Sequence, residues 1–155
     1  MDRVKSTVGF IANKVAWKYR HVLTRVIRQG GYDITPEHWI ILASLRSQGS
    51  VSQIDLARAT YKDKANITRL LKKLLSMNLV KRARCSDDRR HFKVSLTPEG
   101  RVLLKLVTPK LKIATDAIDR HMGEETVAYL KQELGALSDH LDVVIQELEM
   151  ESVVG

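Results

Sequence analysis

The sequence predicts a mainly α-helical protein that contains one β-hairpin. Three observations support this fold class. Apolar residues recur at spacings of three and four in most segments, "TPEH" and "TPEG" repeat one helix-start signal, and apolar and polar residues alternate in "HFKVSL". The 155 residues fit one compact domain, or one domain with long helical extensions, and can bury a core without disulfides.

Composition favours the reducing cytoplasm. The single cysteine, Cys85, cannot pair within the chain, and charges interrupt residues 1–17, which therefore do not resemble a secretory signal. The longest apolar run, "WIILA", is far too short to span a membrane. We therefore expect a soluble cytoplasmic protein with no membrane partner.

The net charge of +8 is unevenly distributed along the chain. Residues 51–100 contain 12 lysines and arginines against 5 acids, and residues 1–50 contain 8 against 3, whereas residues 101–155 contain 6 against 10. A basic excess over the first two-thirds of the chain favours a face that binds a polyanion, although solubility alone can produce a similar skew.

Two amphipathic helices are expected before residue 50. The first covers residues 4–28, where valines and isoleucines are spaced by three, four and seven. The second follows Thr35 as its N-cap, places Pro36 at the first helical position and ends at Gly49.

A pair of shorter helices follows. The first has Ser52 as its cap and Asp55 three residues later, an arrangement similar to a capping box. The second covers residues 64–77 and is strongly two-sided. Its apolar stripe faces away from the side that carries Asn, Arg and Lys, and consists of Ile67, Leu70, Leu71 and Leu74.

Residues 79–85 and 91–96 are expected to form two strands joined by "SDDRR". In the second strand, apolar residues at every other position predict one buried face. Thr97 should cap a fifth helix that extends to about Met122. Pro109 lies inside this helix and removes one backbone donor, so we expect a kink or a brief break there.

The last helix, which begins after Gly123, carries an apolar seam with a regular three-four alternation. Such a seam packs either on its own domain or on a second chain. We favour a homodimer because the long terminal helices have more apolar surface than a small core can cover. The seam residues are Val127, Leu130, Leu134, Leu137, Leu141, Val144 and Leu148.

The order of these elements is that of a winged helix-turn-helix. A short helix, a tight turn and a polar-faced second helix place the second helix in the major groove of DNA, and a basic hairpin follows as a wing over the backbone and minor groove. The predicted fold class is therefore mainly α: a winged helix-turn-helix with a two-stranded β-wing, flanked by long N- and C-terminal dimerisation helices.

At this point the chain resembles the MarR family of bacterial transcription regulators. The resemblance rests on "TPEHWIILASL", "SQIDLARAT", "NITRLLKKLLSMNLVKR" and "DRRHFKVSLTPEG", the last of which fits the family's Asp-x-Arg wing followed by Leu-Thr-x-x-Gly. It implies a homodimer in which residues 1–32 and 101–155 form dimerisation helices and residues 33–100 bind DNA. It also implies a bacterial or archaeal, cytoplasmic and nucleoid-associated regulator, most often a repressor.

The family's DNA contacts carry over to the second short helix and to the wing. Arg90 is expected to enter the minor groove while Asp88 accepts a charge-assisted hydrogen bond from it, and Asp87 is a second acid that departs from the family pattern. Lysines on the helix are read as phosphate contacts or as solubilising charge. The residues expected to contact double-stranded DNA are Ser52, Lys64, Asn66, Thr68, Arg69, Lys73, Arg89 and Arg90.

Relatives in this family bind small, often aromatic and anionic, effectors between the dimer helices and the winged region. Core packing explains Trp39 better than a ligand contact does. A structural or incidental role for Cys85 is favoured over redox sensing, because the sequence contains no second cysteine as a resolving partner. The residues that the resemblance makes candidates for this cleft are Trp17, Tyr19, Arg20, His38 and Arg46.

No metal, cofactor or catalytic activity is expected. The five histidines lack ligand spacing, and the sequence has no phosphate-binding loop or nucleophile motif. Three functions remain open: an effector-responsive regulator that binds a pseudo-palindromic operator, a non-sequence-specific architectural DNA-binding protein, and a winged-helix adaptor between proteins.

Overall fold

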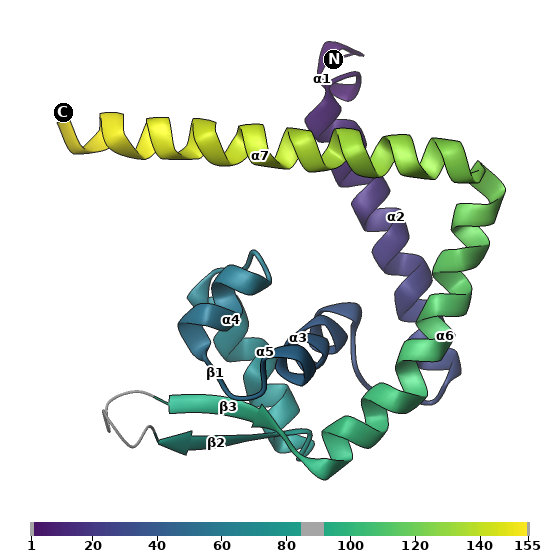
Figure 1. The fold of residues 1–155 in the computed structure, drawn as a ribbon, viewed down its shortest axis with the longest axis vertical. Helices are drawn as coiled ribbons and strands as arrows, with labels where there is room; N and C mark the ends of the chain where they lie inside the picture. Colours follow the sequence, from purple (N-terminus) through teal and green to yellow (C-terminus); the bar gives the residue numbers. More distant parts are fainter. Residues whose placement is uncertain (1, 85–91, 155) are drawn as a thin grey trace. The chain divides into compact units, whose positions relative to one another are not determined.

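The computed structural model describes residues 2–84 and 92–154 and divides the chain into two compact units, residues 1–114 and residues 115–155. Its helices and one small sheet confirm the predicted fold class (Figure 1). The elements in chain order are α1 (Asp2–Lys5), α2 (Val8–Gln29), α3 (Pro36–Gln48), β1 (Val51–Ser52), α4 (Gln53–Ala59), α5 (Lys64–Ser76), β2 (Val80–Arg84), β3 (Phe92–Leu96), α6 (Pro98–Met122) and α7 (Glu124–Val154).

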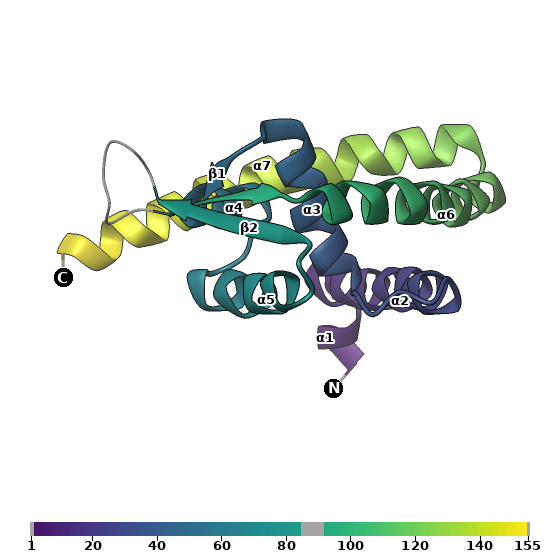
Figure 2. The same cartoon turned by 90° about the horizontal axis from the view of Figure 1, so that it is seen from below.

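The predicted hairpin is present, and a third short strand extends it. Strands β2 and β3 lie side by side (Figure 1 and Figure 2). They pair antiparallel, with Val80 opposite Leu96 and Arg84 opposite Phe92. Strand β1 pairs with the other edge of β3, which gives the order β1-β3-β2. Two residues are too few to show an alternating pattern, so β1 could not be predicted. It forms because the open edge of β3 offers backbone donors and acceptors.

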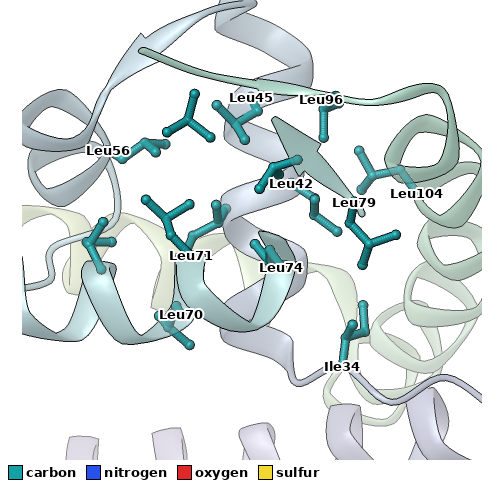
Figure 3. Close-up of a cluster of buried hydrophobic side chains, with 14 of the residues drawn as sticks. Ile34, Leu42, Leu45, Leu56, Leu70, Leu71, Leu74, Leu79, Leu96 and Leu104 are labelled. Atoms are coloured by element: carbon teal, nitrogen blue, oxygen red, sulfur yellow. The ribbon is translucent and has the colours of Figure 1, made fainter. Parts of the chain in front are cut away.

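The core of the first unit lies between α3, α4, α5 and the sheet (Figure 3). All four residues of the stripe predicted on α5 are buried. Because this stripe packs inward, the polar side of α5 is turned to solvent. Fully buried side chains also come from α2 and α6, and the largest are Ile27, Ile41, Leu42, Leu45, Leu56, Ile67, Leu74, Leu104 and Leu111.

The helix predicted over residues 4–28 is divided into α1 and α2 by a turn at Ser6 and Thr7, so the prediction of one continuous helix was wrong. The two hydroxyls donate hydrogen bonds to the carbonyls of Arg3 and Val4, at 2.9 and 2.8 Å. Thr7 then serves as the N-cap of α2. Serine and threonine compete with helical hydrogen bonds in this way, and apolar periodicity cannot register it.

The start of α6 is joined closely to the end of α5. The Thr97 hydroxyl accepts a hydrogen bond from the Gly100 N–H at 3.0 Å and donates to the Asn78 carbonyl at 2.7 Å. A Cβ atom on Gly100 would lie 2.1 Å from the carbonyl oxygen of Leu79. The glycine of "TPEG" therefore permits a close approach between α6 and the chain entering β2.

Helix α6 is continuous through Pro109. Of the kink or break that the sequence predicted there, the break does not occur. Pro109 and Lys105 both lie on the exposed side of the helix, where water can hydrate the carbonyl that loses its helical donor. Nearby, the indole Nε1 of Trp39 donates to the Thr108 hydroxyl at 3.1 Å and ties α3 to α6.

The second unit contains the end of α6 and the long helix α7. Lys131 forms an ion pair with Asp119 across the turn, at 3.5 Å. Most of the apolar seam on α7 remains exposed in the described chain, with Leu134 53 % and Leu148 60 % exposed. Among the described helices, none combines the length and apolar character that crossing a membrane requires.

Candidate DNA-binding surface

The outer face of α5 carries a row of exposed polar side chains. Because the apolar stripe of α5 is anchored in the core, Lys64, Thr68 and Arg69 point to solvent, and Asn66 and Lys73 are half-buried beside them. The sequence predicted this division of the helix into a buried side and a polar side, and the structure confirms it.

Hydrogen bonds order the first two turns of this face. The Asp63 carboxylate caps α5 by accepting from the Asn66 N–H at 2.7 Å and from the Asn66 side-chain amide at 3.3 Å. The side-chain oxygen Oδ1 of Asn66 in turn accepts a hydrogen bond from Nη2 of Arg69 at 3.0 Å. The backbone hydrogen bond from Asn66 lowers the pKa of Asp63 below its ordinary value, so this cap is ionised at neutral pH. Arg69 is therefore held along the helix surface by a relay that begins at the cap.

The two helices of the pair are linked through Thr68. Its hydroxyl donates to the Lys64 carbonyl at 2.8 Å and accepts a hydrogen bond from the Gln53 side-chain amide on α4. Gln53 was not among the predicted site residues. It stands next to Ser52 and 15 positions before Thr68, and only the packing of α4 against α5 brings its amide to that hydroxyl.

Ser52 has a local role at the start of α4. Its hydroxyl accepts from the Asp55 N–H at 3.1 Å and donates to the Asp55 carboxylate at 2.6 Å. The predicted cap is confirmed. A DNA phosphate would have to share this hydroxyl with Asp55.

Lys73 is placed differently from the other cations of α5. Its ammonium forms an ion pair with Asp33, in the segment between α2 and α3. The hydrogen bond and the charge of Lys73 lower the pKa of Asp33. The carboxylate offsets part of the charge that Lys73 could otherwise offer to a phosphate, whereas Lys64 stands exposed in the first turn of α5.

The base of the hairpin carries two arginines that sequence reasoning did not include. The Arg82 guanidinium lies 4.3 Å and that of Arg84 5.8 Å from the ring centre of Phe92. Positions 82 and 84 share one face of β2, and Arg84 is paired with Phe92 across the hairpin, so strand alternation was the signal that could have identified them. Of the predicted wing residues, Asp88, Arg89 and Arg90 lie outside the described residues, as do Cys85 and Asp87.

The candidate cleft residues fall into separate places. Arg20 on α2 forms an ion pair with Glu37 on α3, with Nε 2.8 Å from Oε1. Burial raises the pKa of Glu37, but hydrogen bonds from Thr35 and the backbone, with the charge of Arg20, lower it overall. Tyr19 is half-buried on the same helix as Arg20. Trp17 is 62 % exposed and stacks on His21 at 5.6 Å, and Arg46 is exposed two turns beyond His38.

His38 belongs to the cap of α3. Its Nδ1 accepts a hydrogen bond from the Thr35 N–H at 3.1 Å and lies 2.8 Å from the Thr35 hydroxyl. The side chain is buried, with 8 % exposed. Burial lowers the pKa of His38, Lys73 and Arg69 lower it further, and the acids Glu37 and Asp33 oppose this. His38 is therefore a neutral hydrogen-bond acceptor at neutral pH.

The two units differ more in net charge than the three sequence segments compared above. Residues 1–114 contain 24 lysines and arginines against 8 acids, whereas residues 115–155 contain 2 against 10. The winged region thus belongs to a strongly basic unit, as a protein that contacts phosphates requires. Among the described residues, no group of three or more histidine, cysteine or acidic side chains could hold a metal ion.

Comparisons with known proteins agree with this geometry. The model of the MarR family matches residues 34–92, the segment that contains α3, α4, α5 and β2 and ends at the first residue of β3. The transcriptional regulator FarR of Neisseria gonorrhoeae is 30 % identical over 106 residues, which are 68 % of this chain and 73 % of FarR.

Solved structures show the same fold. BpsR of Bordetella bronchiseptica, solved in work on the regulation of its DNA binding by 6-hydroxynicotinic acid, has a TM-score of 0.80 and 24 % identity, covering 87 % of this chain and 95 % of BpsR. A variant of MarR from E. coli complexed with operator DNA has a TM-score of 0.78 and 22 % identity, covering 84 % and 92 % of the two chains. Together with the identity to FarR and the family match, the polar face of α5 and its basic unit lead to one conclusion: the chain belongs to the MarR family of DNA-binding transcription regulators.

Proposed function

We propose that this protein is a transcriptional repressor that binds a pseudo-palindromic operator as a homodimer and releases it when a small aromatic or anionic effector binds. The observation that carries the proposal is the ordered polar face of α5, with Arg69 held by Asn66 and Asp63, in a strongly basic unit. An arginine fixed in this way loses less conformational freedom when it meets a base edge.

Each candidate residue then has a role on DNA. Asn66, Thr68 and Arg69 face base edges or flanking phosphates in the major groove, and Ser52 and Lys64 contact phosphates. Lys73 contributes less to phosphate contact, because Asp33 already offsets its charge. In the wing, Arg90 enters the minor groove beside Arg89 and is oriented by Asp88. This assignment makes residues 33–100 the DNA-binding region.

The proposal of a homodimer rests on apolar surface that the described chain leaves exposed. Half or more of Val8 and Val15 on α2, and of Leu134, Leu141 and Leu148 on α7, is exposed to solvent. A second copy would bury these surfaces, which assigns residues 1–32 and 101–155 to dimerisation. The two α5 helices would then lie about 34 Å apart, one helical turn of DNA.

Effector control is proposed for the junction of α2 and α3. The Arg20–Glu37 ion pair joins the proposed dimerisation helix α2 to α3 of the winged region, and an anionic effector could compete with Glu37 for Arg20. Trp17, Tyr19, His38 and Arg46 are the other candidates for this cleft. The relative BpsR, whose DNA binding is regulated by 6-hydroxynicotinic acid, supports an aromatic anion as the class of effector. Linkage requires DNA to weaken effector binding by the same factor.

The proposal is tested by selecting bound fragments of the source genome with the purified protein. We expect recovery of a palindrome that binds at least ~1000-fold more tightly than random DNA at the same salt concentration. Equal affinity for the two duplexes would instead support an architectural protein.

Arg69→Ala should weaken binding to the selected palindrome by at least ~5-fold per contacted base pair. Arg101→Ala is the matched control, because Arg101 is an exposed arginine on α6 rather than on α5 and is not among the residues expected to contact DNA. If Arg69→Ala loses no binding and no regulation, an adaptor that binds proteins becomes the better explanation.

A further inference from the structure

Tyr61 occupies an unusual position in the turn between α4 and α5. Its backbone is left-handed, with φ 51°, and its side chain is 85 % exposed. Bulky residues rarely adopt this conformation, because their Cβ approaches a backbone carbonyl too closely. The other non-glycine residue with positive φ among those described is Asn78, a residue type that tolerates it.

The backbone of the turn accounts for the conformation but not for the tyrosine. The Tyr61 N–H donates to the Arg58 carbonyl at 3.2 Å, and the Lys62 N–H donates to the Ala57 carbonyl at 3.0 Å. This double hydrogen bond is the Schellman motif that ends helices, in which glycine is the preferred residue at the left-handed position. Glycine would form the same turn with less strain, and a ring exposed to this degree contributes little to the core.

The turn also has a defined place relative to the polar face of α5. Tyr61 lies two residues before Asp63, the cap of α5, and three before the exposed Lys64. In helix-turn-helix proteins, the N-terminal residues of the second helix contact base edges. The residues just before that helix therefore lie at the rim of the groove, where tyrosine hydroxyls are among the groups that hydrogen-bond to phosphates.

We propose that Tyr61 is a further DNA-binding residue whose phenol hydroxyl donates to a backbone phosphate at the rim of the major groove and sets the depth of α5. The inference rests on the proposed function, because it requires α5 to enter that groove. It explains why a strained, exposed tyrosine stands where glycine would fold more easily. Strain at a position of this kind is typical of binding sites.

The experiment compares full-length Tyr61→Gly and Tyr61→Phe with the unchanged protein. Fluorescence anisotropy measures the affinity for two labelled duplexes of equal length, one recovered by genomic selection and one of random sequence, over a series of salt concentrations. Asn78→Gly is the matched control, because it makes the same backbone change at an exposed left-handed residue at the opposite end of α5.

Tyr61→Gly should weaken binding to both duplexes by a similar factor of at least ~5, the value of one hydrogen bond, and Tyr61→Phe should show most of this loss. The salt dependence should keep its slope, because tyrosine carries no charge. The melting temperature of Tyr61→Gly should equal or exceed that of the unchanged protein, and Asn78→Gly should bind normally.

Three results would overturn the inference: unchanged affinity of Tyr61→Gly, full affinity of Tyr61→Phe, or a lower melting temperature of Tyr61→Gly, which would show that the ring stabilises the fold. Arg69→Ala separates this from a failure of the proposed function. If Arg69→Ala weakens binding to the selected duplex and Tyr61→Gly does not, only the role of Tyr61 is wrong. If neither change weakens it, α5 is not the reading helix.

Discussion

Replacing Gly100 by alanine should destabilise the first unit at the junction of β2 and α6. A Cβ atom at this position would lie 2.1 Å from the Leu79 carbonyl oxygen and 3.0 Å from the Leu79 carbonyl carbon. Ordinary contact begins near 3.4 Å, so the oxygen is too close by about 1.3 Å. Both atoms belong to the backbone, and a change of side-chain rotamer cannot relieve the clash.

The magnitude follows from what must move. Overpacking a well-filled site costs about 1–3 kcal/mol of unfolding free energy. Separating α6 from Leu79 would also strain the hydrogen bonds of Thr97, whose hydroxyl caps α6 and holds the Asn78 carbonyl, and the loss of a helix cap costs about 1 kcal/mol. We therefore expect a loss of about 3 kcal/mol, or about 6–12 °C in melting temperature for a chain of this size.

Urea unfolding followed by circular dichroism, at one fixed protein concentration, measures this loss. Gly135→Ala in α7 is the matched control, because a Cβ atom at Gly135 meets no atom within 4 Å. Alanine there should stabilise by about 0.5–1 kcal/mol through its higher helix propensity. Gly100→Ala as stable as the unchanged protein would refute the reasoning, since the close approach of Leu79 would then have to relax without cost.

Three further predictions concern single side chains. Burial lowers the pKa of His38 below 6.5, so the contribution of neutral His38 to stability is complete above that pH and is lost as the pH falls through the lowered value. His38→Gln should therefore flatten the fall in unfolding free energy below about pH 6.5, by up to ~1.4 kcal/mol per pH unit. Urea titrations at a series of pH values measure this slope. Lys64→Gln should reduce the salt slope of DNA binding by about 2 per dimer. Lys73→Gln should change the slope much less, because Asp33 already offsets the charge of Lys73. Equal reductions by the two changes would show that the ion pair between Lys73 and Asp33 opens on DNA. Arg84 lies beside Phe92 at the base of the wing hairpin, where we expect its guanidinium to meet a backbone phosphate rather than a base. Arg84→Gln should therefore weaken binding to selected and random duplexes alike in anisotropy measurements, and a loss confined to the selected duplex would contradict this expectation.

Local patterns in the sequence predicted the elements that carry the proposed function. The stripe from Ile67 to Leu74 identified the buried side of α5 and so its polar side, because a helix must bury its apolar face. Thr35 and Ser52 marked the starts of two helices, and alternation around Val94 marked the hairpin. These signals lie within a few residues of the structure that they determine.

Where local signals competed, the sequence predictions were less successful. Hydroxyls at Ser6 and Thr7 interrupt a helix whose apolar period continues past them, and Pro109 stays within a helix because its lost hydrogen bond faces solvent. The helix-start signal Thr-Pro-Glu at residues 97–99 gave no indication that the following Gly100 lies against Leu79. Such outcomes depend on what surrounds a residue in space.

The sequence by itself determined the order of the elements, the polar face of α5 and the basic character of the first 100 residues, because amphipathic periods, caps and charge are properties of neighbouring positions. The tertiary structure alone decided how side chains on that face are held. It brought Asp33 to Lys73 across 40 positions and Gln53 to Thr68 across 15, added β1 to the edge of β3, and placed Tyr61 on a left-handed turn beside α5. These pairings arise from packing between elements that are distant in sequence, and residues near each member of a pair carry no signal of its partner.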